Sequence, residues 1–547
     1  MSVKHLQSQR AISAAAIAEP QDEAERPTYR ADRIGAAYAA RVTVEHRKNH
    51  GLYLTPIAVA NFMAAQIAAG GDALRILDPA AGAGILLCAT VEALVARSSA
   101  PRRIELVAYE VDPALAEILA QVLADLRDWG AARGTDIAVE IVCFDFILEH
   151  AAALRSVGGF LPHLSAGRAF DVVIANPPYF KLNKADPRAQ AAASVIHGQP
   201  NIYGLFMAIG AALLRDGGEL LFITPRSFAS GPYFRLFREW FFNSVRPELV
   251  HLFGSRRVAF GRDEVLQENI ILKGLRQDAW VHRDMSAMLT ISASEGVTDL
   301  DSRERRNVRL DSVLDMGSRE KVLRLPVGSL EDDFMRVVDR WPGSLKAFGL
   351  QISTGPVVPF RATEFIDKAG QVPGSHVPLI WMNHVQPMRV TWPLDRRKPE
   401  YIKHVIAAQP LLVPNRNYVL LRRFSAKEEE RRLVAAPYLA RSSTASMIGL
   451  ENHLNYISRP GGTLTEAETF GLAALFNSHL LDNYFRTSNG NTQVSATELR
   501  TMPLPTLEAI TAMGQQIQVL SYDAAALDQL VMQMVGKNHK KKAHARG

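Results

Sequence analysis

Residues 170–180 read FDVVIANPPYF, and this stretch decides the fold expected for the chain. Its apolar run, residues 172–175, is typical of a strand buried in the middle of a sheet. The run ends in an amide, two prolines and an aromatic ring, which are Asn176, Pro177, Pro178 and Tyr179. In open α/β sheets ligands bind at the carboxyl ends of the strands, so these four residues are candidates for a functional site.

The chemistry of this turn suits an amine attached to an aromatic base. Such an amine is a poor nucleophile because its lone pair is delocalised into the ring. The Asn176 side-chain oxygen and the Pro177 carbonyl can accept both amine hydrogens and draw the lone pair out of the ring. The Tyr179 ring can stack on a base taken out of a helix. The alternative is a proline-rich turn after a core strand, with no chemical role.

A second motif lies upstream, where residues 74–87 read LRILDPAAGAGILL. An apolar strand is followed by an acid, a turn of small residues and a helical pattern. Gly82 and Gly84 allow backbone amides to approach a ligand at the start of a helix. The spacing is not that of the dinucleotide-binding fingerprint, and the sequence contains no Gly-Lys-Ser/Thr phosphate loop. Several kinds of nucleotide-binding fold use such turns, so this motif alone is weak evidence.

Two further strands also end in acids. Residues 104–109 precede Glu110, whose carboxylate can accept hydrogen bonds from both hydroxyls of a ribose. Residues 137–143 precede Asp145, an acceptor for an adenine amine, and Phe146, a flat apolar wall beside it. A single acid after a strand is usually a helix cap. Three of them in order, followed by the Asn-Pro-Pro-Tyr turn, favour a ligand site.

These motifs, in this order, resemble the S-adenosylmethionine-dependent N6-adenine DNA methyltransferases in which the cofactor motifs precede the catalytic one. Asp78 to Gly84 resembles the family's Asp-Pro-Ala-Cys-Gly-Ser-Gly loop, with Ala81 and Ala83 in place of Cys and Ser. The segment from Tyr53 to Pro56 resembles the one that closes over the methionine end of the cofactor. The cofactor contacts that the resemblance implies are Thr55, Pro56, Asp78, Pro79, Ala80, Gly82, Gly84, Glu110, Asp145 and Phe146.

The resemblance also implies a reaction. Asn176 to Tyr179 are expected to act on a flipped adenine in double-stranded DNA, with S-adenosylmethionine as cofactor and without a metal. Phe260 follows the sixth expected strand, where related enzymes place an aromatic ring against the flipped base; a core phenylalanine fits equally well. Within this family, the segment that begins at Gln351 resembles the start of the recognition region in PstI-like and Eco57I-like type II restriction-modification methyltransferases. A separately encoded restriction endonuclease is compatible with this interpretation.

The predicted fold class is α/β. Seven apolar runs between residues 74 and 273, with helical patterns between the first five, predict a Rossmann-like, mainly parallel seven-stranded methyltransferase domain. A C-terminal mixed α/β domain is expected to recognise DNA. The expected divisions are a disordered N-terminus (1–27), the catalytic domain (28–290), a linker (291–324), the target recognition domain (325–530) and a basic tail (531–547).

Composition is consistent with these divisions. At 547 residues the chain exceeds the size of about 250–300 residues at which single cores stop growing. With 48% hydrophobic and 22% charged residues, no membrane-length apolar stretch and no signal-peptide pattern, it is expected to be cytoplasmic. Its two cysteines, Cys88 and Cys143, lie in apolar patterns and are expected to pack in the core.

The charge balance and the second half of the chain point to a polyanionic partner. Lys and Arg number 62 against 56 Asp and Glu, a formal net charge of +6. Residues 351–356 begin a segment that resembles the start of the family's recognition region. Residues 411–424, LLVPNRNYVLLRRF, predict one alternating strand whose candidate DNA contacts are Arg416, Arg422 and Arg423. A solvated basic face is the alternative.

Three other functions remain open from the sequence. An RNA-adenine methyltransferase would keep the site and change the partner. Protein-glutamine methyltransferases also use Asn-Pro-Pro-Tyr on an amide nitrogen, but they are much shorter. A non-catalytic DNA-binding protein would fit the basic second half, although the intact acids at Asp78, Glu110 and Asp145 argue against it.

Overall fold

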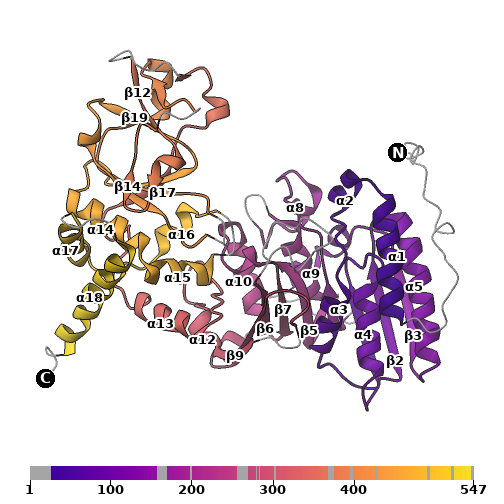
Figure 1. Ribbon diagram of the computed structural model, residues 1–547. Coiled ribbons are helices and arrows are strands. Elements are labelled where there is room, and N and C mark those ends of the chain that lie inside the picture. The colour runs from indigo at the N-terminus through magenta and orange to yellow at the C-terminus, as the bar shows by residue number, and fades with distance from the viewer. Residues whose placement is uncertain are drawn as a thin grey trace. The chain divides into compact units, whose positions relative to one another are not determined.

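A computed structural model gives the fold of the chain and describes residues 26–156, 169–196, 200–254, 269–278, 280–282, 284–300, 304–367, 375–394, 398–425, 429–489, 493–518 and 523–543. The chain divides into two compact units, Met1–Val327 and Gly328–Gly547. Each unit has its own sheets and helices (Figure 1).

The first unit is built on one large sheet. Within the described residues its strand order is β3-β2-β1-β4-β5-β7-β6-β8-β9. Neighbouring strands from β3 to β5 are parallel, whereas β7 is antiparallel to both β5 and β6. The strands are β1 (Ala73–Asp78), β2 (Arg103–Tyr109), β3 (Asp136–Val142), β4 (Phe170–Ala175), β5 (Leu214–Pro225), β6 (Val245–Phe253), β7 (Asn269–Arg276), β8 (Met288–Ser294) and β9 (Glu304–Arg309).

The sheet is larger than the sequence predicts. All seven strands expected from the apolar runs are present, but β8 and β9 extend the sheet to nine, so the predicted count is too low. Strand β9 reads ERRNVR and has mostly exposed side chains; it is a strand because it pairs with β8, not because it is apolar. Residues 291–324, expected to form a linker, instead hold β9 and the short helix α12 (Leu310–Val313) of the first unit.

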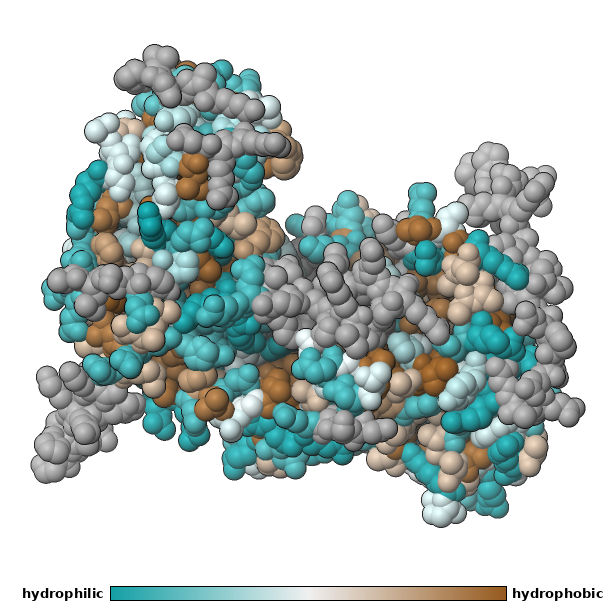
Figure 2. Space-filling model, viewed as in Figure 1, coloured by the Kyte–Doolittle hydropathy of each residue, from teal (hydrophilic) through white to brown (hydrophobic). Residues whose placement is uncertain are grey.

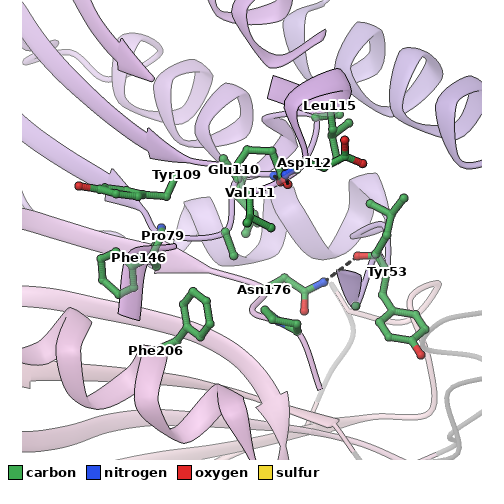
Figure 3. Close-up of a pocket in the computed structure, with 18 of the residues that line it drawn as sticks. Tyr53, Pro79, Tyr109, Glu110, Val111, Asp112, Leu115, Phe146, Asn176 and Phe206 are labelled. Atoms are coloured by element: carbon green, nitrogen blue, oxygen red, sulfur yellow. Dashed lines mark hydrogen bonds between the residues drawn. The ribbon is translucent and has the colours of Figure 1, made fainter. Parts of the chain in front are cut away.

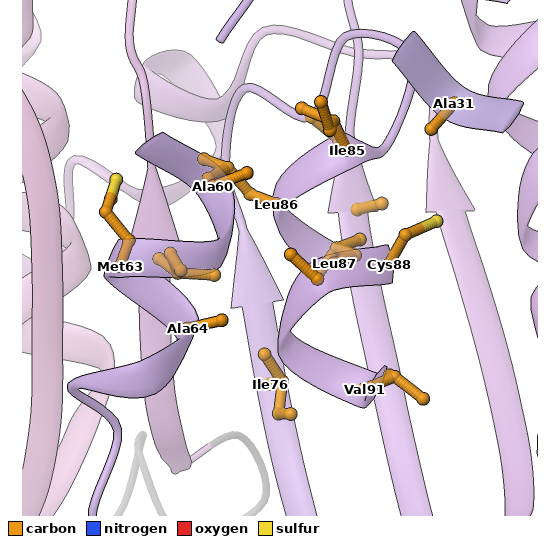
Figure 4. Packing of buried hydrophobic residues seen from close by; sticks show 14 of the residues in the cluster. Ala31, Ala60, Met63, Ala64, Ile76, Ile85, Leu86, Leu87, Cys88 and Val91 are labelled. Atoms are coloured by element: carbon orange, nitrogen blue, oxygen red, sulfur yellow. The ribbon is translucent and has the colours of Figure 1, made fainter. Parts of the chain in front are cut away.

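A hydrophobic core fills the space between the sheet and four helices, α1 (Pro27–Arg41), α3 (Ile57–Ala65), α4 (Ile85–Val95) and α5 (Pro113–Ala131). Helix α4 is apolar along almost its whole length and is buried along it. Figure 4 shows Ala60 of α3 beside Leu86 of α4, with Ile76 of β1 lower down between the two helices. Small side chains in α3 let the two helices approach closely. This packing holds the start of α4 firmly at the end of β1.

The helices of the first unit alternate with its first five strands, and the 3₁₀ turns η3 (Arg226–Ala229), η4 (Pro232–Phe234) and η5 (Trp280–His282) join later elements. The helices are α1 (Pro27–Arg41), α2 (Val44–His50), α3 (Ile57–Ala65), α4 (Ile85–Val95), α5 (Pro113–Ala131), α6 (Phe146–His150), α7 (Ala153–Ser156), α8 (Pro187–Ala191), α9 (Ile202–Leu213) and α10 (Arg235–Ser244).

The two cysteines differ in environment. Cys88 is fully buried in α4, as expected, but Cys143 is exposed. The prediction was wrong for Cys143 because it directly follows β3, the edge strand of the sheet, where the side chains are only partly covered.

The second unit is a mixture of small sheets and helices. Its sheets have the strand orders β10-β20-β17-β18, β11-β15-β12-β19-β16 and β13-β14. The strands are β10 (Gln351–Thr354), β11 (Ile366–Asp367), β12 (His376–Ile380), β13 (Val385–Gln386), β14 (Arg389–Val390), β15 (Tyr401–Lys403), β16 (Leu412–Pro414), β17 (Tyr418–Arg422), β18 (Ala435–Tyr438), β19 (Met447–Leu450) and β20 (Leu454–Ser458). The helices are α13 (Ser329–Val338), α14 (Glu466–Asn477), α15 (His479–Ser488), α16 (Ala496–Thr501), α17 (Leu507–Ile517) and α18 (Ala524–Ala543); the 3₁₀ turns are η6 (Pro359–Arg361), η7 (Met382–His384), η8 (Ile406–Leu411) and η9 (Ala440–Ser442).

The single strand expected over residues 411–424 is wrong. The segment forms β16 and β17, which belong to different sheets. Asn415 breaks the run because its side-chain Nδ2 donates to the main-chain carbonyls of Ala440, Ser443 and Ala445. Strand β17 is also buried on both faces rather than alternating.

The C-terminal end of the chain differs from the prediction of a basic tail. Helix α18 runs to Ala543, so most of the expected basic tail is helical. Residues 1–25 of the expected disordered N-terminus lie outside the described residues. On the face drawn in Figure 2, hydrophobic residues of the described surface are scattered among hydrophilic ones. Among the described helices, none has the length and hydropathy needed to cross a membrane.

Candidate active site

A cavity of about 300 Å³ lies where strands β1 to β4 end (Figure 3). Its walls come from the segments that directly follow these strands, together with residues 51–55 and parts of α1, α5, α8 and α9. Strands β1 and β4 are neighbours in the sheet. The chain continues from β1 to β2 and from β4 to β5, which lie in opposite directions along the sheet. The cavity therefore lies at the switch point of the sheet, where ligands bind in open α/β folds.

The loop after β1 brings main-chain groups to the cavity. Pro79, Ala80 and Gly82 line it. Gly82 and Gly84 have φ of +56° and +86°, in the left-handed region that favours glycine. A side chain on Gly84 would also place its Cβ 2.9 Å from Leu119 Cδ1. The loop can turn into helix α4 this tightly because both positions are glycine.

Asp78 stabilises this loop from within the protein. Its side chain is buried, and Oδ1 accepts a hydrogen bond of 3.0 Å from the amide of Ala80. Its Oδ2 has no hydrogen-bond partner among the described residues. Burial raises the pKa of this carboxyl to about 8. Asp78 is not among the residues that line the cavity, so its observed contact shapes the turn.

Glu110 follows β2 and lines the cavity. Its Oε2 accepts a 3.0 Å hydrogen bond from the amide of Gly82, and its Oε1 accepts one of 2.9 Å from the amide of Asp112. Each carboxylate oxygen can accept more than one hydrogen bond. The side chain is thus fixed by main-chain donors and can still accept from the hydroxyls of a ligand.

Asp112 connects this loop to helices α1 and α2. It caps α5 by accepting from the amide of Ala114 at 3.1 Å. Its Oδ2 lies 2.8 Å from His46 Nε2 and accepts a hydrogen bond from the Tyr38 hydroxyl. The N-terminal helices therefore help to hold the segment that carries Glu110.

Asp145 and Phe146 form the wall that follows β3. Asp145 caps α6, because its Oδ1 accepts from the amides of Ile147 and Leu148 at 2.9 and 3.0 Å. Its Oδ2 lies 3.8 Å from Arg188 Nη1. The acid is therefore both a helix cap and a group that faces the cavity.

Aromatic and aliphatic side chains complete this wall. The Phe146 ring is nearly parallel to that of Phe206, with centroids 5.5 Å apart, and meets the Tyr109 ring edge-on at 5.2 Å. Figure 3 shows the three rings grouped on one side of the cavity. Val111 and Phe144 also line it and are 52% and 53% exposed. Exposed apolar side chains beside a polar loop suit a planar ligand with hydroxyl groups.

The Asn176 turn forms the opposite side of the cavity. Asn176 Nδ2 donates to the Tyr53 carbonyl at 3.2 Å, drawn in Figure 3, and to Thr55 Oγ1 at 3.0 Å. Its Oδ1 accepts from the Tyr179 hydroxyl. That hydroxyl also lies 2.9 Å from the carbonyl oxygen of Ile223 on β5. Burial raises the pKa of Tyr179 well above its ordinary value, so the hydroxyl is a donor at neutral pH.

Comparison with known proteins identifies the chain's relatives. The Eco57I restriction-modification methylase family model matches residues 138–259, which include the Asn176 turn. Over 489 residues the chain is 32% identical to the type II methyltransferase M.BsuBI of Bacillus subtilis, a match that covers 87% of this chain and 93% of that relative. The chain belongs to the type II methyltransferases of restriction-modification systems.

Other relatives of this methyltransferase are similar along most of their length. The type II methyltransferase M.PstI of Providencia stuartii is 31% identical over 90% of this chain and 95% of its own. Among solved structures, the type IIG restriction endonuclease BpuSI aligns with 92% of this chain and 65% of its own, with 14% identity and a TM-score of 0.44.

The methyltransferase uses S-adenosylmethionine as its methyl donor, and the residues around the cavity fit that molecule. Glu110 offers acceptors for ribose hydroxyls, and Val111 and Phe144 offer apolar surface for a purine. At Gly82 an added Cβ would meet nothing within 4 Å, so the backbone is open toward the cavity.

The structure brings together most of the residues that the sequence predicts for this site. Seven of the ten predicted cofactor contacts line the cavity, namely Thr55, Pro79, Ala80, Gly82, Glu110, Asp145 and Phe146. Pro56, Asp78 and Gly84 are not among the lining residues. Of the four predicted catalytic residues, Asn176 and Pro178 line the cavity, whereas Pro177 and Tyr179 lie directly beside them in the turn.

The predicted DNA contacts of the methyltransferase are not among the residues that line the cavity. Phe260 is outside the described residues. The three arginines belong to the second unit, and each donates to a main-chain carbonyl there: Arg416 to Gly462 at 2.7 Å, Arg422 to Val385 at 2.7 Å and Arg423 to Asn452 at 3.0 Å. These contacts fasten loops of the second unit to one another.

Several residues at the site were missed from the sequence. Both Asp112 and Arg188 lie at acid–proline signals of helix starts. Asp112 is the acid of Asp112-Pro113, shortly after β2, and Arg188 directly follows Asp186-Pro187, downstream of the catalytic turn. Phe206 lies on the first turns of α9 and could have been found from the helix that opens at Asn201. Val111 and Phe144 carry no local signal besides their position next to predicted contacts.

Proposed function

We propose that this methyltransferase transfers a methyl group to the exocyclic N6 amine of an adenine in double-stranded DNA. The proposal rests on the hydrogen bonds that the Asn176 carboxamide makes at the edge of the cavity. Its NH2 group already donates to Tyr53 and Thr55, so its oxygen is the end available to an incoming amine. An amine that donates to this oxygen is held next to the cofactor cavity.

The proposed mechanism uses the turn to activate and orient the base. S-adenosylmethionine supplies an electrophilic methyl group on its sulfonium. Asn176 Oδ1 and the Pro177 carbonyl accept the two amine hydrogens and localise the nitrogen lone pair. The amine nitrogen bonds to the methyl carbon as the carbon–sulfur bond breaks and its electron pair stays on sulfur, which gives S-adenosylhomocysteine. The methylated nitrogen, now positively charged, then releases one proton to water. Holding the two reactants in line supplies most of the rate enhancement.

Tyr179 is proposed to hold the adenine by stacking. An ordinary tyrosine is already neutral near pH 7, and burial raises the pKa of Tyr179 further, so the ring stays neutral. Stacking on an aromatic ring typically contributes about 1–3 kcal/mol per base. Since the target amine is inaccessible inside a duplex, the base is proposed to leave the helix before it reaches this ring.

The cofactor contacts are proposed from the cavity. Glu110 binds the ribose hydroxyls, Asp145 accepts from the adenine amine and Phe146 forms the wall beside the ring. The backbone of residues 79–82 lies along the cofactor, and the main chain at Thr55 and Pro56 closes over its methionine end, which leaves the Thr55 hydroxyl on Asn176. Asp78 and Gly84 act through the shape of the loop.

The second unit is proposed to recognise the DNA target. Arg416, Arg422 and Arg423 contribute by fixing its loops as well as by their charge, because each guanidinium donates to a neighbouring carbonyl. A separately encoded restriction endonuclease is the proposed biological counterpart of this methyltransferase.

The test is methyl transfer from labelled S-adenosylmethionine to mixed genomic DNA, with mass spectrometry of the nucleosides. N6-methyladenine is the expected product. Asn176→Ala is expected to reduce transfer by about 100- to 1000-fold, the range for loss of one preorganised group, while cofactor binding by calorimetry is retained. Asn183→Ala, which removes an exposed amide seven residues further along, serves as the control.

The other outcomes are equally informative. Labelled cytosine would contradict the base assignment. Labelled RNA or protein with unlabelled DNA would contradict the proposed substrate. Wild-type turnover in Asn176→Ala would contradict the assignment of the catalytic turn.

A further inference from the structure

The orientation of a catalytic carboxamide is a separate requirement from its position. One end of the Asn176 side chain only accepts hydrogen bonds and the other only donates. In the proposed function, on which this inference rests, the oxygen must face the target amine. If the group were rotated by half a turn, its NH2 would face the amine, and two donors would meet. Something in the protein must therefore select one orientation.

The selection is visible in the contacts of the NH2 end. Nδ2 lies 3.0 Å from Thr55 Oγ1 and 3.2 Å from the Tyr53 carbonyl oxygen. The reversed carboxamide would place its oxygen against that carbonyl oxygen, and two acceptors would then face each other. Thr55 is 4% exposed, so water has little access to replace the hydroxyl. The cost of an unmet hydrogen bond at such a site is large.

The backbone holds the segment that carries these acceptors directly against the turn. Gly51 has φ +61°, and a Cβ built on it would lie 2.3 Å from Pro178 Cβ. The rings of Tyr53 and Tyr179 are nearly parallel, at an angle of 14° with centroids 6.2 Å apart. Residues 51–55 and the turn thus form one packed assembly in which Thr55 meets Asn176.

The oxygen end has a partner that can be released. The Tyr179 hydroxyl has a single hydrogen but two acceptors within reach, Asn176 Oδ1 and the Ile223 carbonyl oxygen at 2.9 Å. Rotation of this hydroxyl toward Ile223 frees Oδ1 for an amine without moving the Tyr179 ring.

We propose that Thr55 is a positioning residue. The Tyr53 carbonyl, which can only accept, selects the orientation of the Asn176 carboxamide, and the Thr55 hydroxyl accepts the second N–H and holds the carboxamide there with its oxygen toward the target amine. The sequence resemblance suggests only a cofactor contact for Thr55. The two roles make different predictions, because a cofactor contact acts on binding, whereas a residue that orients Asn176 acts on the transfer step.

The test compares Thr55→Val, which keeps the shape but lacks the hydroxyl, with Thr55→Ser, which keeps the hydroxyl. For Thr55→Val we expect kcat to fall by at least about tenfold, equivalent to about 1.4 kcal/mol, with the Kd for S-adenosylmethionine by calorimetry within about twofold of wild type. Thr55→Ser is expected to retain most of the kcat. A duplex with 2-aminopurine at the position that the wild type methylates should show the same fluorescence rise with both variants, because neither changes the Tyr179 ring on which the extruded base is proposed to stack.

Three results would overturn the proposal. A wild-type kcat in Thr55→Val would show that the hydroxyl does not orient Asn176. A weakened Kd for S-adenosylmethionine with unchanged kcat would make Thr55 a cofactor ligand instead. Equal loss in Thr55→Ser would assign the effect to packing of the methyl group. Absence of DNA methylation by the wild type would overturn the proposed function itself, so the two failures are distinguishable.

Discussion

Asp78 is a residue whose chemistry departs far from its ordinary behaviour. It lies at the end of the first strand, fully buried, with a pKa raised to about 8 from an ordinary 3.8. A carboxyl that binds its proton more tightly in the folded protein stabilises the fold only while it is protonated. That stabilisation is complete below pH of about 4 and is lost as the pH rises to about 8.

We expect Asp78→Asn to remove this dependence on pH. Asparagine keeps the oxygen that accepts from the Ala80 amide but cannot ionise. The difference between the unfolding free energies of the variant and the wild type should therefore increase in favour of the variant between pH 5 and pH 8, by up to about 1.4 kcal/mol per pH unit. Above pH 8 this difference should stay constant. Urea unfolding followed by circular dichroism at each pH measures the difference. A difference that stays constant with pH would show that Asp78 ionises normally.

Single residues also show how far sequence reasoning reaches into the site. The types and order of Glu110, Asp145 and Asn176 could be predicted, because each directly follows an apolar strand. Their partners could not. Tyr38 and His46 reach Asp112 from helices far earlier in the chain, and Thr55 reaches Asn176 across 121 positions. Such contacts depend on the folded arrangement and leave no local pattern.

At the scale of elements, the crossing of α14 and α17 is the tightest constraint in the second unit. A Cβ on Gly514 would lie 1.8 Å from the Ala467 carbonyl oxygen, and one on Gly471 would lie 1.9 Å from that of Ile510. The two helices touch backbone to backbone, so neither glycine has room for a side chain.

Gly514→Ala is therefore expected to destabilise the second unit, although alanine has the higher helix propensity. Overpacking of this kind typically costs about 1–3 kcal/mol, and backbone contacts of this closeness are at the upper end. Thermal unfolding measures the loss. Gly70→Ala is the matched control, because the nearest atom to its added Cβ is 4.0 Å away. Equal stability of Gly514→Ala and wild type would contradict the close crossing.

Some strands of the fold could be predicted from the sequence, and others could not. The seven apolar strands were predictable because strands of a sheet that is covered on both faces are mostly apolar on both faces. Strand β9 was not, since its polar residues make a strand only through pairing with β8. The break between β16 and β17 depends on three carbonyls that Asn415 meets only in the folded unit.

At the scale of the whole molecule, the cofactor cavity belongs to one unit. All of its lining residues lie between positions 31 and 206, and the core cluster around it lies within Met1–Val327. The ordered motifs of this unit made its fold class predictable. The second unit, built of short strands in separate sheets, has no comparable periodic pattern.

This division predicts that a fragment of residues 1–327 binds S-adenosylmethionine without the second unit. We expect a Kd within about tenfold of the full chain, equivalent to about 1.4 kcal/mol, and no site-specific DNA methylation. Calorimetry and a DNA methylation assay check the two parts. The same fragment with Glu110→Ala should bind more weakly. A fragment that is folded by circular dichroism but does not bind the cofactor would contradict this prediction.

The contrast between the two cysteines offers a practical reporter. Cys88 is sealed inside the core, whereas the exposed Cys143 thiol sits next to Phe144 and Asp145 at the cavity wall. A maleimide dye would therefore attach to the native chain at one place. Partial desolvation, followed by the negative charges of Glu110 and Asp112, raises the pKa of the Cys143 thiol. The labelling rate should therefore continue to increase to a higher pH than for an ordinary cysteine. The fluorescence of the attached dye would then follow cofactor loading and release in real time, without radioactivity and without an engineered cysteine.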